Sequence, residues 1–243
     1  MTFHDLHKPG EPLLLPNAWD YGSAALLAAR GYPAIGTTSL GVAAVHGKPD
    51  AAAATRAETL DLVLLVKDLP AYLTVDIENG FSDDPAAVAE LVDLLAGLGV
   101  AGINLEDGRA DGTLRPIAEQ TRILRAVTGR GVFVNARTDA HWLGTGDSAT
   151  ERIRAYADAG ADGVFVPGVA DLAAIAELAK ATELPLNVLY SHGVAELAGV
   201  GVARISTGSL LYRAALQGAL AVLEKDPALP TYEEIVGLLP DPR

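Results

Sequence analysis

Five acidic residues follow three short apolar runs of this chain, in positions where carboxylates could bind a metal ion. Asp76 and Glu78 end one run two residues apart, so strand alternation would point both side chains to the same side. Glu106 and Asp107 follow the next run, and Asp139 a third. The runs have the length and composition of buried strands. An unpaired carboxylate inside a protein is costly. If adjacent strands bring these groups together, a hard divalent cation such as Mg²⁺ is the partner they need. The alternative is that each carboxylate caps a helix or forms a surface salt bridge.

Arg137 and the polar segment 37–39 are candidates for binding an anionic substrate. Arg137 ends the run before Asp139, and a guanidinium can hold a carboxylate through two parallel hydrogen bonds. It could also serve as the counter-ion of Glu106 or Asp139. Segment 37–39 is Thr-Thr-Ser, whose hydroxyls and N–H groups could bind a carboxylate or an oxyanion. Capping of the following helix is the other role open to it.

Three further features fit a pocket but have ordinary explanations too. Asp50 follows Gly-Lys-Pro and alone is typical of a turn or a cap. Trp19 could form a pocket wall or pack in the core. The glycine-rich segment 199–208 could bind a phosphate, as the last loops of some barrels do. The histidines lack the His-Glu-x-x-His spacing, which argues against a zinc site.

Strand-like and helix-like segments alternate along the whole chain, and this order predicts how the polar residues are positioned. The apolar runs have no polar alternation, as expected for parallel strands covered on both faces. Eight such units predict one α/β domain over residues 1–243, a (β/α)8 TIM-type barrel with its active face at the strand C-termini. The predicted strands are 13–15, 34–38, 72–77, 101–105, 132–136, 163–166, 186–189 and 203–206.

Composition narrows the class of protein. The chain has 243 residues, 50% of them hydrophobic, a net charge of −13 and no cysteine. The negative charge argues against a nucleic-acid partner, and the lack of cysteine excludes disulfides and thiol chemistry. No apolar run is long enough to span a membrane, and the first residues lack the apolar core of a signal peptide. We therefore expect a cytoplasmic protein without a membrane partner.

Motifs along nearly the whole chain resemble the isocitrate lyase/phosphoenolpyruvate mutase superfamily. The resemblance implies a Mg²⁺-dependent (β/α)8 barrel, with Mn²⁺ as a possible substitute, that acts on a small 2-oxo acid. It also implies a homo-oligomer, a dimer or tetramer, in which the C-terminal helix is exchanged between subunits. Segment 232–239 could add one more helix that packs on a neighbour. The matching segments are Pro16–Asp20, Gly47–Asp50, Asp76–Phe81, Ile103–Asp107 and Ala136–Asp139.

The same resemblance implies a metal site built from four carboxylates. By position, Asp76 is the principal Mg²⁺ ligand, and Asp50, Glu78 and Glu106 hold metal-bound waters. This chain departs from the family's Asp-x-Asp motif, because Glu78 replaces the second aspartate.

The resemblance also implies the substrate-binding residues. Arg137 corresponds to the residue that binds the substrate carboxylate. Thr38, with the backbone of Ser39 and Leu40, corresponds to the segment that binds the oxyanion end of the substrate. Trp19 is a candidate for the wall of the substrate pocket. We expect Glu106, Arg137 and Thr38 to take part in catalysis, in which a bond beside the carbonyl breaks to leave a metal-stabilised enolate.

At some positions this chain lacks residues that the family uses, and these differences limit the reactions that it is expected to catalyse. Segment 108–115 replaces the lid of the family's lyases and carries no cysteine, and 167–168 is Pro-Gly where the mutase has a histidine. These differences favour a carbon–carbon lyase or decarboxylase, such as one acting on oxaloacetate. Arg109 or Arg115 could bind a distal carboxylate or phosphonate, and segment 190–192 could supply an acid.

Three alternatives stay open at this stage. The nearest is a phosphonopyruvate-type mutase or hydrolase, in which a P–C bond is broken or moved. The second is a non-catalytic protein that binds a 2-oxo acid. The third is a barrel that binds a sugar phosphate through segment 199–208.

Overall fold

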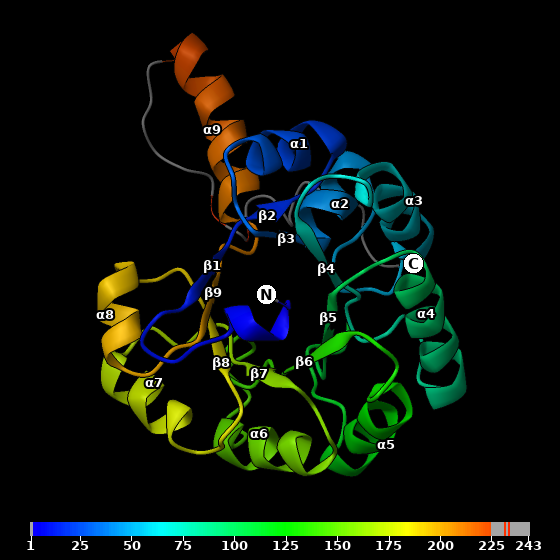
Figure 1. The fold of residues 1–243 in the computed structure, drawn as a ribbon, viewed down its shortest axis with the longest axis vertical. Helices are drawn as coiled ribbons and strands as arrows, with labels where there is room; N and C mark the ends of the chain where they lie inside the picture. Colours follow the sequence, from blue (N-terminus) through cyan, green and yellow to red (C-terminus); the bar gives the residue numbers. More distant parts are fainter. Residues whose placement is uncertain (1, 225–230, 232, 234–243) are drawn as a thin grey trace.

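The structure, a computed structural model, describes residues 2–224, 231 and 233. In these residues the strands form one parallel sheet curled into a barrel (Figure 1), in the order β1-β9-β8-β7-β6-β5-β4-β3-β2. The strands are β1 (Leu13–Leu15), β2 (Asn17–Ala18), β3 (Ala34–Thr37), β4 (Tyr72–Asp76), β5 (Gly102–Glu106), β6 (Phe133–Arg137), β7 (Gly163–Phe165), β8 (Leu186–Leu189) and β9 (Arg204–Ser206).

The first barrel strand is split in two at Pro16. Proline has no N–H to donate to a strand ladder, although the Pro16 carbonyl still accepts a hydrogen bond from the Gly36 N–H at 2.9 Å. β1 pairs with β9 and β2 pairs with β3, so the two pieces together join both edges of the sheet. The predicted TIM-type barrel is therefore confirmed, with nine assigned strands in eight barrel positions of the described chain.

Helices surround the sheet on its outer side (Figure 1). Apolar side chains of the strands pack against the inner faces of these helices and form the main core. The helices are α1 (Tyr21–Ala29), α2 (Ser39–Val45), α3 (Arg56–Val66), α4 (Pro85–Gly97), α5 (Ile117–Val127), α6 (Ala149–Asp158), α7 (Leu172–Ala179), α8 (Val194–Gly199) and α9 (Leu210–Glu224).

Side-chain caps fix where several of these helices begin. Asp84 caps α4 by accepting a hydrogen bond from the Ala86 N–H at 3.1 Å, and Pro85 is the first helical residue. Ser148 and Asp171 cap α6 and α7 in the same manner. Each cap satisfies N–H groups that have no partner within the helix. Because each cap follows a loop of the active face, it also fixes the end of that loop.

The interior of the barrel is arranged in layers set by the register of β5 and β6. Asn104 pairs with Asn135, and Glu106 pairs with Arg137 one layer higher. Alternate side chains of a strand point to opposite faces, and the residues between these pack against the helices. Asn135 Nδ2 donates to Asn104 Oδ1 at 2.9 Å. The register thus places Glu106 and Arg137 side by side at the C-terminal end of the barrel.

A short 3-10 helix, η1 (His4–Leu6), closes the opposite end of the barrel (Figure 1). Phe3 packs edge-on against Phe133 with ring centroids 5.7 Å apart, and His7 stacks on the same ring at 4.2 Å. A Cβ on Gly102 would lie 2.7 Å from the Phe3 ring. Only glycine at that position leaves room for this aromatic plug.

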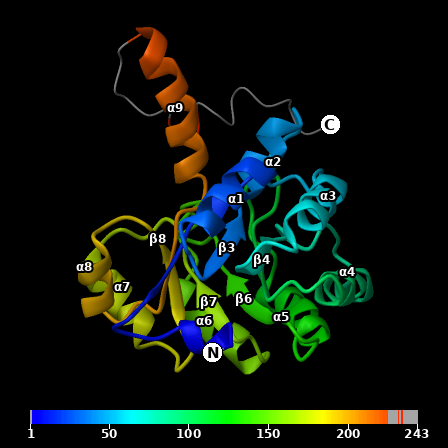
Figure 2. The same cartoon turned by 45° about the horizontal axis from the view of Figure 1, so that its top comes forward.

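Helix α9 projects away from the barrel and the other helices (Figure 2). Its outer turns expose Leu220, Val222 and Leu223. Of the segment 232–239, where one more helix is expected, the structure describes residue 233 alone, so that prediction lies outside the described residues. In the part of the chain that is described, no helix is long and apolar enough to cross a membrane.

Candidate active site

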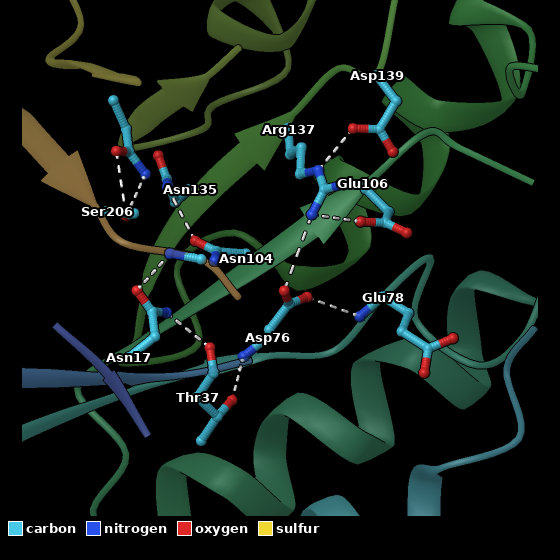
Figure 3. Close-up of polar contacts among 12 residues, drawn as sticks. Asn17, Thr37, Asp76, Glu78, Asn104, Glu106, Asn135, Arg137, Asp139 and Ser206 are labelled. Atoms are coloured by element: carbon cyan, nitrogen blue, oxygen red, sulfur yellow. Dashed lines mark hydrogen bonds and ion pairs between the residues drawn. The ribbon is translucent and has the colours of Figure 1, made fainter. Parts of the chain in front are cut away.

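A cavity of about 320 Å³ opens at the C-terminal ends of the strands. Its walls come from the loops that follow β3 to β9, which is the active face of barrels of this type. Besides Arg109, it is lined by five charged residues that the sequence singles out: Asp50, Asp76, Glu106, Arg137 and Asp139. Figure 3 shows four of them, Asp50 excepted, and the side chain of Arg137 points toward three carboxylates.

Arg137 is the centre of this cluster. Its Nη1 lies 2.9 Å from Glu106 Oε2 and 3.8 Å from Asp76 Oδ2, and its Nε lies 2.6 Å from Asp139 Oδ1 (Figure 3). The guanidinium also lies over the Phe165 ring at 5.5 Å. The counter-ion role considered for Arg137 is therefore present, and the side chain lines the cavity at the same time.

The carboxylates of the cluster outnumber its cation, and their pKa values reflect this. Burial raises the pKa of Asp76 to about 6, although Arg137 partly opposes the shift. Burial also raises the pKa values of Glu106 and Asp139, again against Arg137. A raised carboxylate pKa means that the charged form lacks stabilisation. The cluster can therefore gain by taking up another cation.

The donor set fits Mg²⁺ bound largely through water. In residues 2–224, 231 and 233, no three acidic or imidazole side chains are arranged to ligate one ion together. Mg²⁺ typically keeps several waters and uses one or two carboxylates. The carboxylates of Asp50, Asp76 and Glu106 line one cavity and can meet that requirement.

Asp76 is held in place from two sides. Its N–H donates to Thr37 Oγ1 at 2.9 Å, which ties the end of β4 to β3. Its Oδ1 accepts a hydrogen bond from the Glu78 N–H at 3.1 Å. One carboxylate oxygen is thus fixed by backbone, and Oδ2 faces Arg137 (Figure 3).

Glu78 does not point into the cavity with Asp76. Its Oε2 accepts from the Ala53 N–H at 2.8 Å, and its Oε1 accepts from Thr55 Oγ1 at 2.6 Å. Strand alternation predicts that two residues at this spacing share a face. β4 ends at Asp76, however, and Glu78 adopts a φ of +49° in the turn that follows. Its carboxylate therefore holds the loop that carries Asp50.

Asp107 is a structural residue of the barrel wall. It is fully buried, and its Oδ2 accepts hydrogen bonds from Tyr156 and from Arg152 Nη1, the latter at 3.0 Å. Its Oδ1 accepts from the Asp139 N–H at 2.9 Å. Asp107 therefore supports Asp139 from behind and does not line the cavity.

Segment 38–40 lines the cavity as expected. Thr38 is the N-cap residue of α2, but its side chain makes no capping hydrogen bond. The capping role considered for its hydroxyl is thus absent, which leaves the group available to a ligand. Thr37 is different, because its hydroxyl already binds the backbone of Asp76.

Of the two roles considered for Trp19, pocket wall or packing, the structure shows packing. It does not line the cavity, its ring packs edge-on against Tyr212 at 5.2 Å, and a Cβ on Gly41 would lie 2.6 Å from its Cβ. The proposal that Trp19 binds substrate is therefore not supported by its position.

The two arginines considered for a distal anion differ in position. Arg115 is buried and binds Asp83 at 2.8 Å and Gln120 at 2.7 Å, away from the cavity. Arg109 lines the cavity, but its Nη2 lies 2.9 Å from Glu119.

Two further loop segments were considered for ligand binding. One lies outside the cavity lining, and the other contains an N–H that is already hydrogen-bonded. Segment 190–192 lies outside the cavity lining. In segment 199–208, the Gly208 N–H donates to Asn17 Oδ1 at 3.0 Å, so this N–H is not available to a phosphate.

Several lining residues were missed by sequence reasoning. Asn17 and Asn104 reach the cavity from β2 and β5, and the position of Asn104 two residues before Glu106 was a usable signal. An apolar group from three later loops had no such signal, because its members are ordinary hydrophobic residues: Trp142, Leu143, Phe165, Pro167 and Leu189.

Comparison with known proteins assigns the chain to a family. The family model for phosphoenolpyruvate phosphomutase matches residues 3–225. The chain therefore belongs to that family, within the isocitrate lyase/phosphoenolpyruvate mutase superfamily, which includes lyases and mutases. The resemblance seen in the sequence motifs is confirmed.

Two relatives by sequence cover most of the chain. An uncharacterised protein of Mycobacterium tuberculosis is 46% identical over 226 residues, which is 90% of this chain and 86% of that protein. The 2-methylisocitrate lyase of Salmonella typhimurium is 31% identical over 205 residues, which is 74% of this chain and 70% of the enzyme.

Solved structures agree with this assignment. A candidate phosphonomutase of Burkholderia cenocepacia matches with a TM-score of 0.83 and 38% identity, covering 92% of this chain and 98% of that one. A phosphonopyruvate hydrolase, solved with oxalate and Mg²⁺, matches with a TM-score of 0.81 over 98% of this chain and 95% of that one. At 23% identity the second match shows the common fold alone.

Proposed function

We propose that the protein is a Mg²⁺-dependent carbon–carbon lyase or decarboxylase that acts on a small 2-oxo acid through an enolate. The observation that carries this proposal is the sharing of Arg137 among Asp76, Glu106 and Asp139 in one cavity at the strand C-termini. Oxaloacetate is the first substrate to test. Membership of a family of lyases and mutases supports the reaction class.

In this proposal the carboxylates hold the metal. Asp76 is the principal ligand, and Asp50 and Glu106 hold its waters. When bound, Mg²⁺ supplies a Lewis acid that stabilises negative charge on the substrate oxygens. Glu78 acts indirectly by holding the loop of Asp50, since both of its oxygens are hydrogen-bonded there.

The remaining residues bind and orient the substrate. Arg137 binds the carboxylate through its planar guanidinium, while Glu106 and Asp139 keep the guanidinium in position. The hydroxyl of Thr38 and the N–H groups of Ser39 and Leu40 bind the oxygen on which charge develops. Asp76, fixed by Thr37 and the Glu78 N–H, sets where the 2-oxo acid lies.

A phosphonopyruvate-type mutase or hydrolase is the second candidate. It is favoured by the family model, which is that of phosphoenolpyruvate phosphomutase, and by the candidate phosphonomutase among the similar structures. The Pro-Gly pair at 167–168, where the family resemblance implies a histidine in the mutase, makes it the weaker of the two.

A ligand screen with product detection tests the proposal. Thermal unfolding is followed with small 2-oxo acids and phosphonates, in Mg²⁺ and in EDTA, and each stabilising compound is then incubated for product analysis. We expect Mg²⁺-dependent stabilisation by 2-oxo acids, with cleavage products for at least one. Phosphonate turnover would favour the second candidate, and stabilisation without any turnover would favour a binding protein. A response that is the same in EDTA would contradict the metal site.

We also propose that α9 packs on a second subunit, as the family resemblance implies. Leu220 is 40% exposed, and Val222 and Leu223 are about 80% exposed, on a helix that projects from the barrel (Figure 2). Exposed apolar clusters of this kind often mark subunit contacts. Sedimentation velocity should give a dimer or tetramer, and substitution of Val222 and Leu223 by glutamate should reduce its size. A monomeric wild type would contradict the exchange.

A further inference from the structure

A buried arginine of the barrel interior makes its hydrogen bonds to neutral groups. Arg204, on β9, is 1% exposed. Its Nε donates to Ser206 Oγ at 3.3 Å and its Nη2 donates to Asn104 Oδ1 at 3.1 Å, whereas Nη1 has no hydrogen-bond partner among the described residues. Burial lowers the pKa of Arg204 to about 9, and the charge of Asp76 opposes this shift. The guanidinium therefore stays protonated at neutral pH.

This guanidinium fixes the direction in which the Asn104 amide points. A protonated arginine side chain can only donate hydrogen bonds, so the Asn104 atom that faces it must be the oxygen. Asn135 Nδ2 donates to the same oxygen at 2.9 Å (Figure 3). Two linked amides could turn over together, but the arginine cannot exchange its donors for acceptors. The nitrogen of Asn104 must therefore point away from both partners.

Asn104 Nδ2 is left as a donor that faces the cavity. Asn104 lines the cavity one layer deeper than Glu106, and the register of β4 and β5 pairs it with Asp76. Among the described residues, none accepts a hydrogen bond from Nδ2. Nor is Nδ2 one of the fully enclosed nitrogens that lack a partner. It is therefore open to the cavity and can donate to a ligand.

Given the 2-oxo acid site proposed above, we further propose that Asn104 Nδ2 donates a hydrogen bond to a negatively charged oxygen of the bound acid, and that Arg204 is the positioning residue for this donor. A fixed donor of this kind contributes most when charge accumulates on the oxygen it contacts. Asn104 thus binds the substrate from the floor of the cavity, together with Arg137 and Thr38. Arg204 acts through Asn104 and does not touch the substrate.

Asn104→Asp tests the donor with little change of shape. The new carboxylate keeps an oxygen for Arg204 and Asn135 but replaces the N–H groups that face the cavity with a second oxygen. Calorimetry with oxalate at saturating Mg²⁺ measures the affinity, and circular dichroism checks the fold. We expect oxalate to bind at least about tenfold more weakly, the loss typical of a hydrogen bond to a charged group.

Asn187→Asp is the matched control for this substitution. Asn187 is a buried asparagine that pairs with Arg204 in the register of β8 and β9, but it does not line the cavity. The control therefore places the same new charge in the barrel interior without removing a donor from the cavity. Its oxalate affinity should stay close to that of the wild type.

A second set of variants separates binding from stability. Asn104→Leu removes an acceptor from a buried guanidinium and should lower the free energy of unfolding in urea. Adding Arg204→Met replaces both partners by apolar side chains, which should recover much of that stability. Oxalate affinity should stay as low in the double variant as in Asn104→Leu. Arg204→Met alone should weaken oxalate binding, and the losses should not add, because both substitutions remove the same fixed donor.

The outcomes distinguish the two proposals. Oxalate affinity that recovers together with stability in the double variant would show that Asn104 is structural alone. Unchanged affinity in Asn104→Asp, or equal losses in Asn104→Asp and Asn187→Asp, would also overturn the role of Asn104, while normal Mg²⁺-dependent binding to the wild type would leave the 2-oxo acid site in place. Absence of Mg²⁺-dependent oxalate binding to the wild type would overturn both proposals.

Discussion

Arg137 Nη1 lies 2.9 Å from Glu106 Oε2, and the register of the sheet pairs the same two residues across β5 and β6. The ion pair is therefore positioned by the backbone ladder and not by a flexible loop. It forms the top layer of the barrel interior, directly above the bonded pair Asn104 and Asn135. A substrate carboxylate that reaches Arg137 meets a guanidinium whose orientation is already set.

The first prediction concerns that orientation. Arg137→Lys keeps the positive charge but loses the planar fork that can bind two oxygens at once. We expect the variant to bind oxalate in Mg²⁺ at least about tenfold more weakly, the loss typical of a charge-assisted hydrogen bond. Calorimetry measures the affinity, and circular dichroism checks the fold. Unchanged oxalate affinity would remove Arg137 from the binding site.

The second prediction concerns the loop that carries Asp50. Glu78 accepts hydrogen bonds from Ala53 and Thr55, and Ala51 and Ala53 have φ values of +54° and +55°. Such conformations need support from their surroundings. Glu78→Ala should therefore expose the loop to proteases and weaken Mg²⁺ binding. Thr55→Val, which removes one of the two bonds, should have a smaller effect of the same kind. Weakened Mg²⁺ binding with an unchanged cleavage rate would instead indicate that Glu78 contacts the metal shell itself.

The third prediction separates Asp107 from the cavity carboxylates. Tyr156 donates a buried hydrogen bond to Asp107. Tyr156→Phe should lower the free energy of unfolding by about 1–3 kcal/mol, because a buried acceptor loses a partner. Urea unfolding measures that loss. Oxalate affinity at saturating Mg²⁺ should stay unchanged, and a large fall in affinity without a loss of stability would give this pair a functional role.

The fourth prediction concerns the aromatic plug at the other end of the barrel. Burial lowers the pKa of His7 from 6.5 to about 3, and the nearby charges of Arg204 and His4 act in the same direction. His7 is thus neutral in the folded protein but takes up a proton in the unfolded chain below pH 6.5. Its contribution to stability is present above that pH and is lost as the pH falls toward 3, by up to about 1.4 kcal/mol per pH unit.

His7→Phe, which keeps the ring on Phe133, measures this contribution. The difference in unfolding free energy between wild type and variant cancels the titration of other groups. It should be constant above about pH 7 and should shift in favour of the variant between about pH 6 and pH 4. A difference that does not change with pH would show that the pKa of His7 is the same in the folded and the unfolded protein.

The barrel itself was predictable because its signal is local and repeated. Each apolar run is a buried strand, and the residues just beyond it must lie at the active face whatever the loops do. This logic placed Asp76, Glu106, Arg137 and Asp139 together correctly. The cap at Asp84 follows from equally local chemistry, since Asp-Pro before an amphipathic segment is a typical helix start.

The predicted positions that differ from the structure belong to residues outside regular strands and helices. Glu78 was assigned to the face of Asp76 by strand alternation, but β4 ends before it and a left-handed residue turns its side chain away. Trp19 was placed in the cavity wall, whereas the close approach of Gly41 and Tyr212 holds it in the packing. Backbone turns and small-residue contacts of this kind depend on distant segments, so they cannot be read from local pattern.

The apolar group that lines the cavity could not be predicted for a related reason. Trp142, Phe165 and Leu189 come from different β/α units and resemble core residues one at a time. Their common place in the cavity lining appears only when the closed sheet brings three loops together.

The most direct test of the metal-assisted 2-oxo acid site is oxalate binding to Asp76→Ala. Calorimetry is run on the variant and the wild type, in Mg²⁺ and in EDTA, with Asp83→Ala as a control for removing a carboxylate outside the cavity. We predict tight binding to the wild type and the control in Mg²⁺ only, and none to Asp76→Ala, which should still unfold cooperatively. Normal Mg²⁺-dependent binding to folded Asp76→Ala would contradict the site.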